Sequence, residues 1–182
     1  MIYVYLADGF EEVETVAPVD ILRRAGKTVV TVSITDKKEV KGARGVTFVA
    51  DALIGEIDIE KAELIVLPGG CPGFENLAAC DKVTEHIEFM LKTDRLVAAI
   101  CGAPAAVLGA KGYLENVRAT CYPGMEEMMR GAAVYHGDVC VDKNIITAKA
   151  AGSAIEFALT LARLTAGDDI ATKVKESIVY NG

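Results

Sequence analysis

The 182-residue chain lacks features that would place it in several common functional classes. It has no run of basic residues, and its 26 acidic side chains outnumber its 19 lysines and arginines, giving a net charge of −7. Nucleic acids are bound through clustered positive charge, so no nucleic-acid partner is expected. The longest uncharged run, residues 96–110, is interrupted by glycine and proline and is too short to cross a bilayer. No membrane partner is expected either.

The cysteines are few and irregularly spaced. Their number is odd, at five, and no C-x-x-C pair occurs, which argues against a disulfide framework and against a zinc site. An apolar strand is predicted to begin at Ile2, and this leaves no room for a signal peptide. The sequence therefore predicts a protein of the reducing cytoplasm with no bound metal.

Motifs that hold a nucleotide phosphate are also absent. The glycine-rich stretch Pro68–Gly73 follows a predicted strand but fits neither G-x-G-x-x-G nor G-x-x-x-x-G-K-[ST]. Glycines at the carboxyl end of a strand instead indicate a close approach of the backbone to a ligand or a reacting atom. No cofactor is expected.

What the sequence does contain is an apolar strand that leads directly into a helix, with one cysteine between them. Leu96–Ile100 is continuously apolar, as in a parallel strand covered on both faces, and Pro104 suits the first turn of a helix. Cys101 then lies at a sharp turn beside the small residues Gly102 and Ala103, which is the layout of a nucleophile elbow. A helix N-terminus would favour its thiolate, although an inert buried cysteine fits the same pattern.

Strands and helices alternate along the whole chain. Helices are predicted at Glu11–Arg24, Asp81–Lys92, near Met125–Met129, at Ser153–Leu164 and at Ile170–Ile178. Strands are predicted at Ile2–Leu6, Thr28–Ile34, Leu64–Leu67, Leu96–Ile100 and Val117–Cys121, with hairpins within Val40–Ala50 and Val139–Thr147 and a loop from Asp51 to Glu60. This rhythm predicts one α/β domain over residues 1–182, a doubly wound and mainly parallel sheet with helices on both faces.

The predicted topology gathers several turns at one edge of the sheet. Right-handed crossovers bring the carboxyl ends of parallel strands to the same edge, where such sheets bind ligands. The turns at Asp8, Gly69–Gly70, Cys101 and Tyr122 are therefore expected to meet.

Four segments together resemble the signatures of the ThiJ/PfpI superfamily, and within it the branch that contains the Parkinson disease protein 7 deglycase and its bacterial relatives. They are Leu6–Thr15, Leu67–Gly70, Ala99–Cys101 and Glu156–Leu159, and they occur in the family's order over almost the whole chain. The resemblance implies a flavodoxin-like fold and a homodimer.

The resemblance also implies a set of functional residues. Cys101 would be the reactive cysteine at the elbow, and Glu14 on the first helix would contact it. The backbone N–H groups of Gly70 and Gly102 would act as oxyanion donors. An alternative for Glu14 is an ordinary acidic residue of a helix's first turn, a position that the helix dipole favours.

The pairing of a carboxyl with a thiol has a physical logic of its own. Two adjacent anions repel, so a carboxyl beside a thiolate in a partly buried pocket tends to stay protonated. A protonated Glu14 can then donate a hydrogen bond to the sulfur of Cys101. The same bond could stabilise a sulfinate formed by oxidation.

The sequence departs from the family pattern where histidines are concerned. Tyr122 stands where family members often carry a histidine near the cysteine, and a phenol is a poor general base at neutral pH. Gly102 stands where the PfpI protease branch has a histidine, so peptidase activity is not expected. The two histidines of the chain are elsewhere: His86 is expected at the surface of a helix, and His136 is not expected to reach Cys101.

Cys71 and Cys121 are predicted to lie near Cys101, because each follows a strand that ends at the same edge. The favoured interpretation is that they, with Tyr122, only line the rim of the pocket. A disulfide formed with oxidised Cys101 is a weaker alternative, and a soft metal held by the three thiols is weaker still.

These observations favour a cysteine-dependent stress protein. Its substrates would be small carbonyl compounds such as methylglyoxal, or early glycation adducts on proteins, attacked by the Cys101 thiolate with help from Glu14. An alternative from another class is a redox sensor or stress chaperone, in which the same cysteine is oxidised and no turnover occurs.

Overall fold

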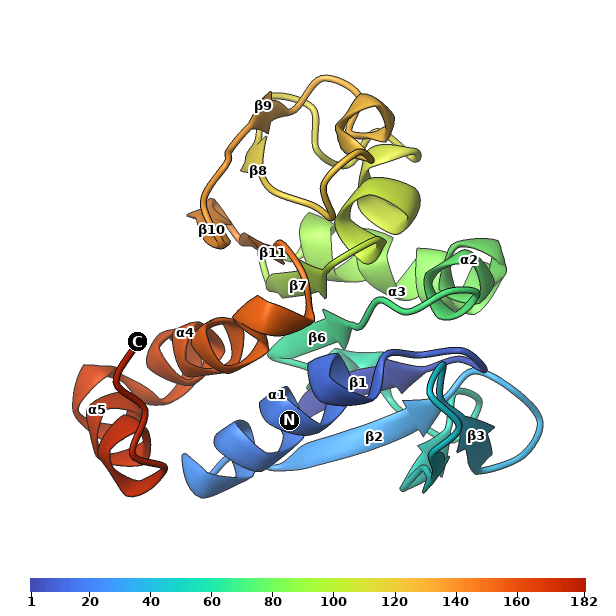
Figure 1. Ribbon diagram of the computed structural model, residues 1–182. Helices are drawn as coiled ribbons and strands as arrows, with labels where there is room; N and C mark the ends of the chain where they lie inside the picture. Colours follow the sequence, from blue (N-terminus) through green and yellow to red (C-terminus); the bar gives the residue numbers. More distant parts are fainter.

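In a computed structural model that describes residues 1–182, seven strands form a central sheet (Figure 1). Every neighbouring pair is parallel except the antiparallel pair at one edge, β10 with β11. In spatial order the strands are β10 (Val139–Asp142), β11 (Ile145–Ala148), β7 (Leu96–Ile100), β6 (Leu64–Leu67), β1 (Ile2–Leu6), β2 (Val29–Ser33) and β5 (Ala52–Leu53). The predicted flavodoxin-like, mainly parallel α/β fold is confirmed.

The central strands are apolar on both faces because helices cover both. All five residues of β1 and all four of β6 are buried. Side chains of a strand alternate between faces, so Tyr3 and Tyr5 enter one apolar cluster while Ile2 and Val4 enter the other. Continuous apolar runs of this kind are typical of a parallel sheet between two helical layers.

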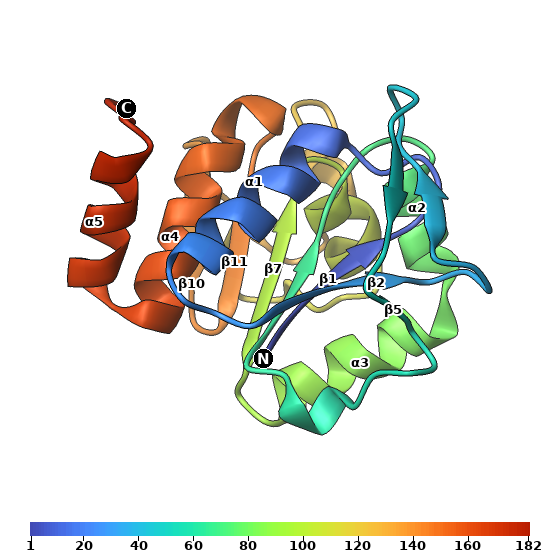
Figure 2. The same cartoon turned by 90° about the horizontal axis from the view of Figure 1, so that it is seen from below.

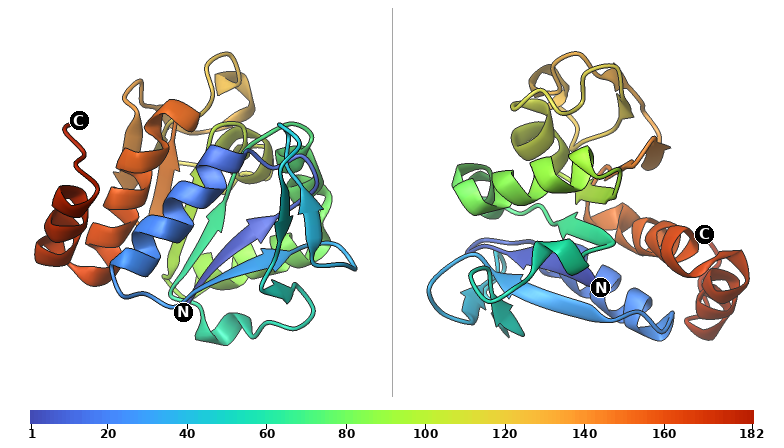
Figure 3. Two further views of the ribbon diagram at one scale, coloured as in Figure 1. Left: turned by 60° about the horizontal axis from the view of Figure 1, so that its bottom comes forward. Right: turned by 180° about the vertical axis from the view of Figure 1, so that it is seen from behind.

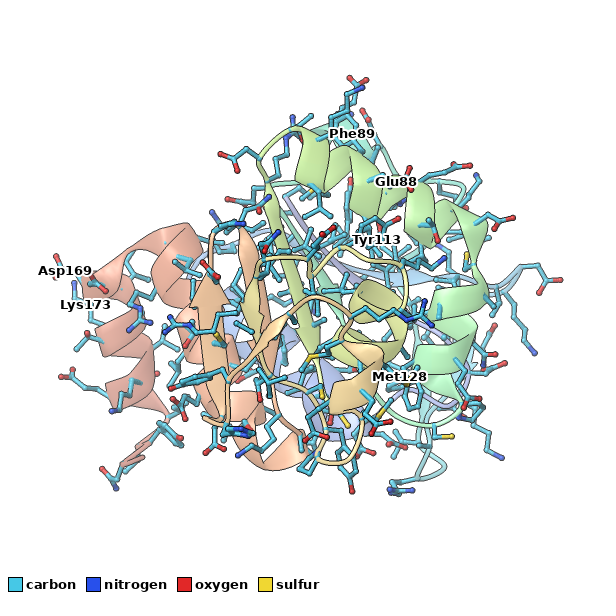
Figure 4. The ribbon with its side chains drawn as sticks, turned by 90° about the horizontal axis from the view of Figure 1, so that it is seen from above. Glu88, Phe89, Tyr113, Met128, Asp169 and Lys173 are labelled. Atoms are coloured by element: carbon cyan, nitrogen blue, oxygen red, sulfur yellow. The ribbon has the colours of Figure 1, made fainter.

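The helices divide between the two faces of the sheet. One layer consists of α1 (Glu12–Arg24), α4 (Ala154–Ala166) and α5 (Asp168–Ser177), and Figure 2 shows α1 beside α4. The other consists of α2 (Gly73–Ala79), α3 (Asp81–Lys92) and the π-helical turn η2 (Pro104–Gly109). In this second layer, the Tyr113 hydroxyl beyond η2 donates a hydrogen bond to the Glu88 carboxylate on α3 at 2.8 Å (Figure 4).

Smaller elements lie outside the central sheet. Strands β3 (Glu39–Lys41) and β4 (Thr47–Val49) form the predicted antiparallel hairpin, which lies at the opposite end of the molecule from α5 (Figure 3). The remaining short elements are the 3₁₀ turns η1 (Ile59–Lys61), η3 (Glu126–Met128) and η4 (Ala151–Ser153), and the parallel pair β8 (Arg118–Ala119) and β9 (Ala133–Val134).

The predicted strand Val117–Cys121 does not join the central sheet. Only Arg118 and Ala119 are extended, and they pair with β9. The edge of β11 that this strand would use is occupied by β10. Its backbone instead bonds to side chains: the N–H of Thr120 donates to Thr147 Oγ1 at 2.9 Å, and that of Arg118 donates to Asp142 Oδ2 at 2.7 Å.

His86 does not lie on the surface as the sequence suggested. It is half-buried between α3 and the sheet, where its Nδ1 and the hydroxyl of Tyr5 share a hydrogen bond of 2.7 Å. Burial lowers the pKa of this imidazole. His86 therefore ties α3 to β1.

No helix of this fold combines the length and the apolar character that crossing a membrane requires.

The core of the α1 and α4 layer offers a first test of the fold. Phe157 on α4 is fully buried, so Phe157→Ala should lower the free energy of unfolding by about 3–5 kcal/mol, because it removes apolar burial and leaves a cavity. Leu164→Ala on the same helix is the matched control, since that side chain is 41% exposed, and its effect should stay within about 0.5 kcal/mol. Denaturant unfolding measures both, and equal effects would contradict the placement of α4.

Candidate active site

The backbone at Cys101 takes a conformation that few residues adopt. Its φ is +67°, in the left-handed region, directly after β7 and before η2. Hydrogen bonds on both sides hold this turn: the Cys101 N–H donates to the Ala148 carbonyl at 2.9 Å, and the Tyr122 N–H donates to the Cys101 carbonyl at 2.7 Å. The strained turn at the predicted elbow is therefore fixed by its neighbours.

Glycines next to Cys101 allow the surrounding backbone to come close. A Cβ on Gly69 would lie 2.6 Å from the Cβ of Cys101 and 2.7 Å from Oε2 of Glu14. A Cβ on Gly102 would lie 2.7 Å from the ring of Phe74. Both contacts are closer than real Cβ atoms make. Gly69 meets the Cβ of the fixed elbow and so requires glycine for space, whereas at Gly102 a larger residue would have to displace the Phe74 ring.

Glu14 lies on α1 with only 1% of its surface exposed, which is unusual for a carboxyl group. Its Oε2 accepts a hydrogen bond from the Gly69 N–H at 2.8 Å, whereas Oε1 is buried with no hydrogen-bond partner of standard geometry. Burial raises the pKa of Glu14 to about 7, although the Gly69 N–H and the Cys101 thiol each lower it. The carboxyl is therefore half-protonated near neutral pH.

The pKa of Cys101 is shifted upward. Burial is the main cause, and the neighbouring Glu14 carboxylate raises the pKa further, while the N–H groups of Gly102 and Gly70 lower it. The sequence suggested the opposite direction, from the helix N-terminus. A helix of the π type begins there, but desolvation and the adjacent carboxylate outweigh it.

Cys101 and Glu14 must be treated as one titrating pair. The pKa of Glu14 is about 7 and that of Cys101 is raised to about 12, so loss of the first proton leaves mainly a carboxylate beside a thiol. Transfer of the remaining proton from the thiol to Glu14 gives the less populated thiolate form. When the proton is on Glu14, the carboxyl can donate to the thiolate, and the amides of Gly70 and Gly102 face the same sulfur. This arrangement can hold a nucleophile with its proton donor adjacent.

The pair opens into a pocket of about 450 Å³, which we call the Cys101 pocket. Six of the seven sequence-predicted site residues line it: Glu14, Gly70, Cys71, Cys101, Gly102 and Tyr122. Its other lining residues were not identified from the sequence; they are Glu11, Arg44, Phe74, Met125, Ala150, Ala151 and Gly152. Arg44, whose guanidinium lies 3.8 Å from the Glu11 carboxylate, comes from the β3–β4 hairpin, whose position depends on tertiary structure.

Cys121 is the predicted pocket residue that the structure places elsewhere. It is 4% exposed and lines a separate hollow together with His136 and Lys149. The reason is that consecutive side chains point in different directions: Tyr122 reaches the Cys101 pocket, while the thiol of Cys121 turns back to the Tyr122 carbonyl at 3.4 Å. Burial raises the pKa of this thiol to about 11.

A family model places the chain among known proteins. The model described as "DJ-1/PfpI family" matches residues 1–164. Among solved structures, oxidized DJ-1 from Toxoplasma gondii superposes with a TM-score of 0.95 at 35% identity, over 100% of this chain and 98% of the other.

Curated relatives agree with this placement. The Parkinson disease protein 7 homolog of Danio rerio is 34% identical over 97% of this chain and 95% of its own length. A Caenorhabditis elegans protein named glutathione-independent glyoxalase DJR-1.2 is 32% identical, over 87% of this chain and 84% of that protein. Protein DJ-1 homolog B of Arabidopsis thaliana is 37% identical over 96% of this chain, but the chain spans only 40% of that plant protein's length.

The raised pKa of Glu14 predicts how the free energy of unfolding changes with pH. The folded protein keeps this carboxyl neutral up to about pH 7, whereas the unfolded chain ionises it near 4.5, so its contribution to stability is lost as pH rises between these values. Glu14→Gln cannot ionise and keeps the shape of the side chain. Relative to wild type it should gain about 3 kcal/mol in the free energy of unfolding above pH 7, and little of this gain should remain below pH 4.5.

Denaturant unfolding at both pH extremes measures this difference. Asp20→Asn, at an exposed carboxylate on the same helix that pairs with Arg24, is the control and should change the free energy of unfolding by no more than about 0.5 kcal/mol at either pH. A Glu14→Gln effect that is the same at both extremes would show that Glu14 has an ordinary pKa.

Proposed function

Because this chain belongs to the DJ-1/PfpI family, we propose that it is a cysteine-dependent enzyme acting on small reactive carbonyl compounds or early glycation adducts. The observation that carries the proposal is the buried Glu14 carboxyl beside the Cys101 thiol, at the base of an open pocket. A relative that is named a glutathione-independent glyoxalase supports the same chemistry. We take a 2-oxoaldehyde such as methylglyoxal as the model substrate.

The first step is addition of the thiolate to the aldehyde. The sulfur of Cys101 forms a bond to the aldehyde carbon, and the C=O π electrons move to oxygen. Glu14, which takes up the thiol proton as the thiolate forms, passes this proton to the oxygen and becomes a carboxylate again. The amides of Gly70 and Gly102 face the sulfur and lie next to the developing oxyanion, which they stabilise.

The second step is an internal transfer of hydrogen that requires no external oxidant. The Glu14 carboxylate removes the proton from the former aldehyde carbon, and a proton returns to the neighbouring carbon, giving a 2-hydroxy thioester. Water then hydrolyses the thioester, which releases a 2-hydroxy acid and restores the thiol and the shared proton. A carboxyl with a pKa near 7 suits both roles, as acid and as base.

Tyr122 contributes a hydrogen-bond donor rather than a base. It is 49% exposed and lines the Cys101 pocket, so its phenol can contact a carbonyl oxygen of the substrate. His86 and His136 lie outside this pocket, and with no histidine there a Cys-His peptidase mechanism has no support.

Turnover is tested by the formation of 2-hydroxy acid from methylglyoxal over many equivalents per protein. Cys101→Ala should abolish it, and Glu14→Gln should reduce kcat by about 100-fold or more, because the shuttle of protons is lost. Glu14→Leu should raise the pKa of Cys101 above that in Glu14→Gln by about one to two units, because glutamine keeps a donor to the thiolate. Ultraviolet titration of the thiolate measures this second difference.

The same experiment separates the enzyme from a sensor. Consumption of at most one equivalent of methylglyoxal, together with oxidation of Cys101 by mild peroxide, would overturn the enzymatic proposal in favour of a redox sensor or stress chaperone. Equal thiolate titrations in Glu14→Gln and Glu14→Leu would show that hydrogen bonding from residue 14 does not control the sulfur.

We also propose that the protein forms a homodimer. An apolar face lies beside α1, the helix that carries Glu14. Val13, Val16, Ile155 and Val179 are exposed on this face, and Ile178 is half-buried. Val16 is 47% exposed and Val179 is 76% exposed, and apolar side chains gathered in this way mark an interaction surface. A second copy of the chain would cover this face.

A charge within the apolar face should disrupt the dimer. Val16→Asp should shift the protein to the monomer, because a carboxylate would be buried without a partner. Leu164→Asp, at an exposed leucine outside the apolar face, is the matched control and should leave the association unchanged. Sedimentation equilibrium measures both, and a wild-type monomer would refute the proposal.

A further inference from the structure

A second thiol, that of Cys71, lines the Cys101 pocket and has no part in the carbonyl chemistry. Its side chain is exposed, whereas Cys121 and Cys140 are buried. It also lines a neighbouring hollow of about 600 Å³ formed with the β3–β4 hairpin. Cys71 is therefore accessible both from solvent and from the pocket that holds Cys101.

The backbone before Cys71 is in contact with Cys101. Gly69 is so close that an added Cβ would lie 3.1 Å from the Cys101 sulfur, and the N–H of Gly70 faces the same sulfur. Cys71 follows directly, with its Cα about 3.8 Å from that of Gly70. Cys71 is therefore one residue away from the amide that faces the Cys101 sulfur, on a segment whose backbone closely approaches Cys101.

The Cys71 side chain is free to turn toward the pocket. Its one hydrogen-bond partner is the Glu75 carboxylate, at the long distance of 4.0 Å and at the surface. Rotation about a single side-chain torsion breaks no other polar contact. Cys101, by contrast, is fixed by the elbow, so the movement that joins the two sulfurs falls to Cys71.

We propose that Cys71 is the resolving cysteine of Cys101 and that peroxide converts the two into an intramolecular disulfide. In the first step the Cys101 thiolate attacks peroxide: an S–O bond forms, the O–O bond breaks, and water leaves after protonation. In the second step the Cys71 sulfur attacks the sulfenic sulfur: the S–S bond forms, and the S–O bond breaks. Overall two thiols lose two electrons and two protons, and one peroxide becomes two waters.

Glu14 assists the second step. The hydroxide that leaves Cys101 requires a proton, and the Glu14 carboxyl beside that sulfur supplies it. The proton of the Cys71 thiol passes to solvent through the exposed side of the pocket. The disulfide blocks the nucleophile but is reversible with a dithiol, whereas further oxidation of Cys101 to sulfinate is not.

The other cysteines do not compete for this role. Cys121 and Cys140 are buried, and their thiols bond to the backbone carbonyls of Tyr122 and Arg118. Cys80, between α2 and α3, is half-buried and does not line the Cys101 pocket. The structure therefore places Cys71 in the Cys101 pocket and Cys121 outside it, whereas both were predicted from the sequence to line this pocket.

Peptide mapping under non-reducing conditions tests the proposal. Protein treated with a small excess of hydrogen peroxide is alkylated and digested with trypsin and with a protease that cleaves after glutamate. Cleavage after Glu75 separates Cys71 from Cys80, which otherwise share one tryptic peptide. We expect a linked peptide pair containing Cys71 and Cys101 in a protein that runs as a monomer on a non-reducing gel, and loss of this pair after treatment with a dithiol.

Two variants complete the test. In Cys71→Ser, peroxide should oxidise Cys101 further to sulfinate. The fraction of Cys101 that a dithiol reduces back to the thiol should therefore fall severalfold relative to wild type. Cys80→Ser is the matched control and should form the disulfide as wild type does. A Cys101–Cys121 link, a link between two chains, or equal sulfinate in wild type and Cys71→Ser would each overturn the proposal.

This inference requires a reactive Cys101 but not carbonyl turnover, so the two proposals fail separately. The disulfide without 2-hydroxy acid formation would refute the glyoxalase-like activity alone. Turnover of methylglyoxal without the disulfide would refute the role of Cys71 alone.

Discussion

The arrangement of the site depends on a carboxyl group buried where water cannot solvate it. Glu14 is held by one N–H, that of Gly69, and lies beside the Cys101 thiol, while its other carboxyl oxygen is buried without a hydrogen-bond partner. Such burial opposes ionisation, and the site therefore keeps one mobile proton between carboxyl and sulfur. Gly69 and the strained elbow follow from the same requirement, since each lets the backbone close around this pair.

Much of the fold could be predicted because its signals are local. The apolar runs of β1, β6 and β7 and the glycine-rich turn after β6 lie in short stretches of sequence, and the structure has them where they were expected. Elements with weak local signals were missed: β5 has two residues and α2 has seven. The position of β8 was predicted wrongly because it depends on tertiary structure: β10 occupies the edge of β11 that β8 would otherwise use.

The same distinction applies to the candidate site: residues in local motifs could be predicted, and residues placed by tertiary structure could not. Motifs identified Cys101, Glu14, Gly70 and Gly102, and the structure brings them together. The direction of the Cys101 pKa shift could not be predicted, since it depends on how deeply the thiol is buried. Arg44 escaped notice because the hairpin gives no local sign of where it folds. Cys121 was misplaced because the direction of a side chain in an irregular segment is not encoded by its spacing.

The hydrogen bond from the Tyr122 N–H to the Cys101 carbonyl affects which side chains the wall of the Cys101 pocket can carry. The elbow depends on the backbone N–H of residue 122, whereas the phenol ring is half-exposed and forms one wall of the pocket. Any amino acid except proline supplies that N–H. Evolution, or a library of variants, can therefore exchange the ring for a smaller, larger or charged side chain and so change which molecules are admitted, while the geometry of the nucleophile is inherited unaltered.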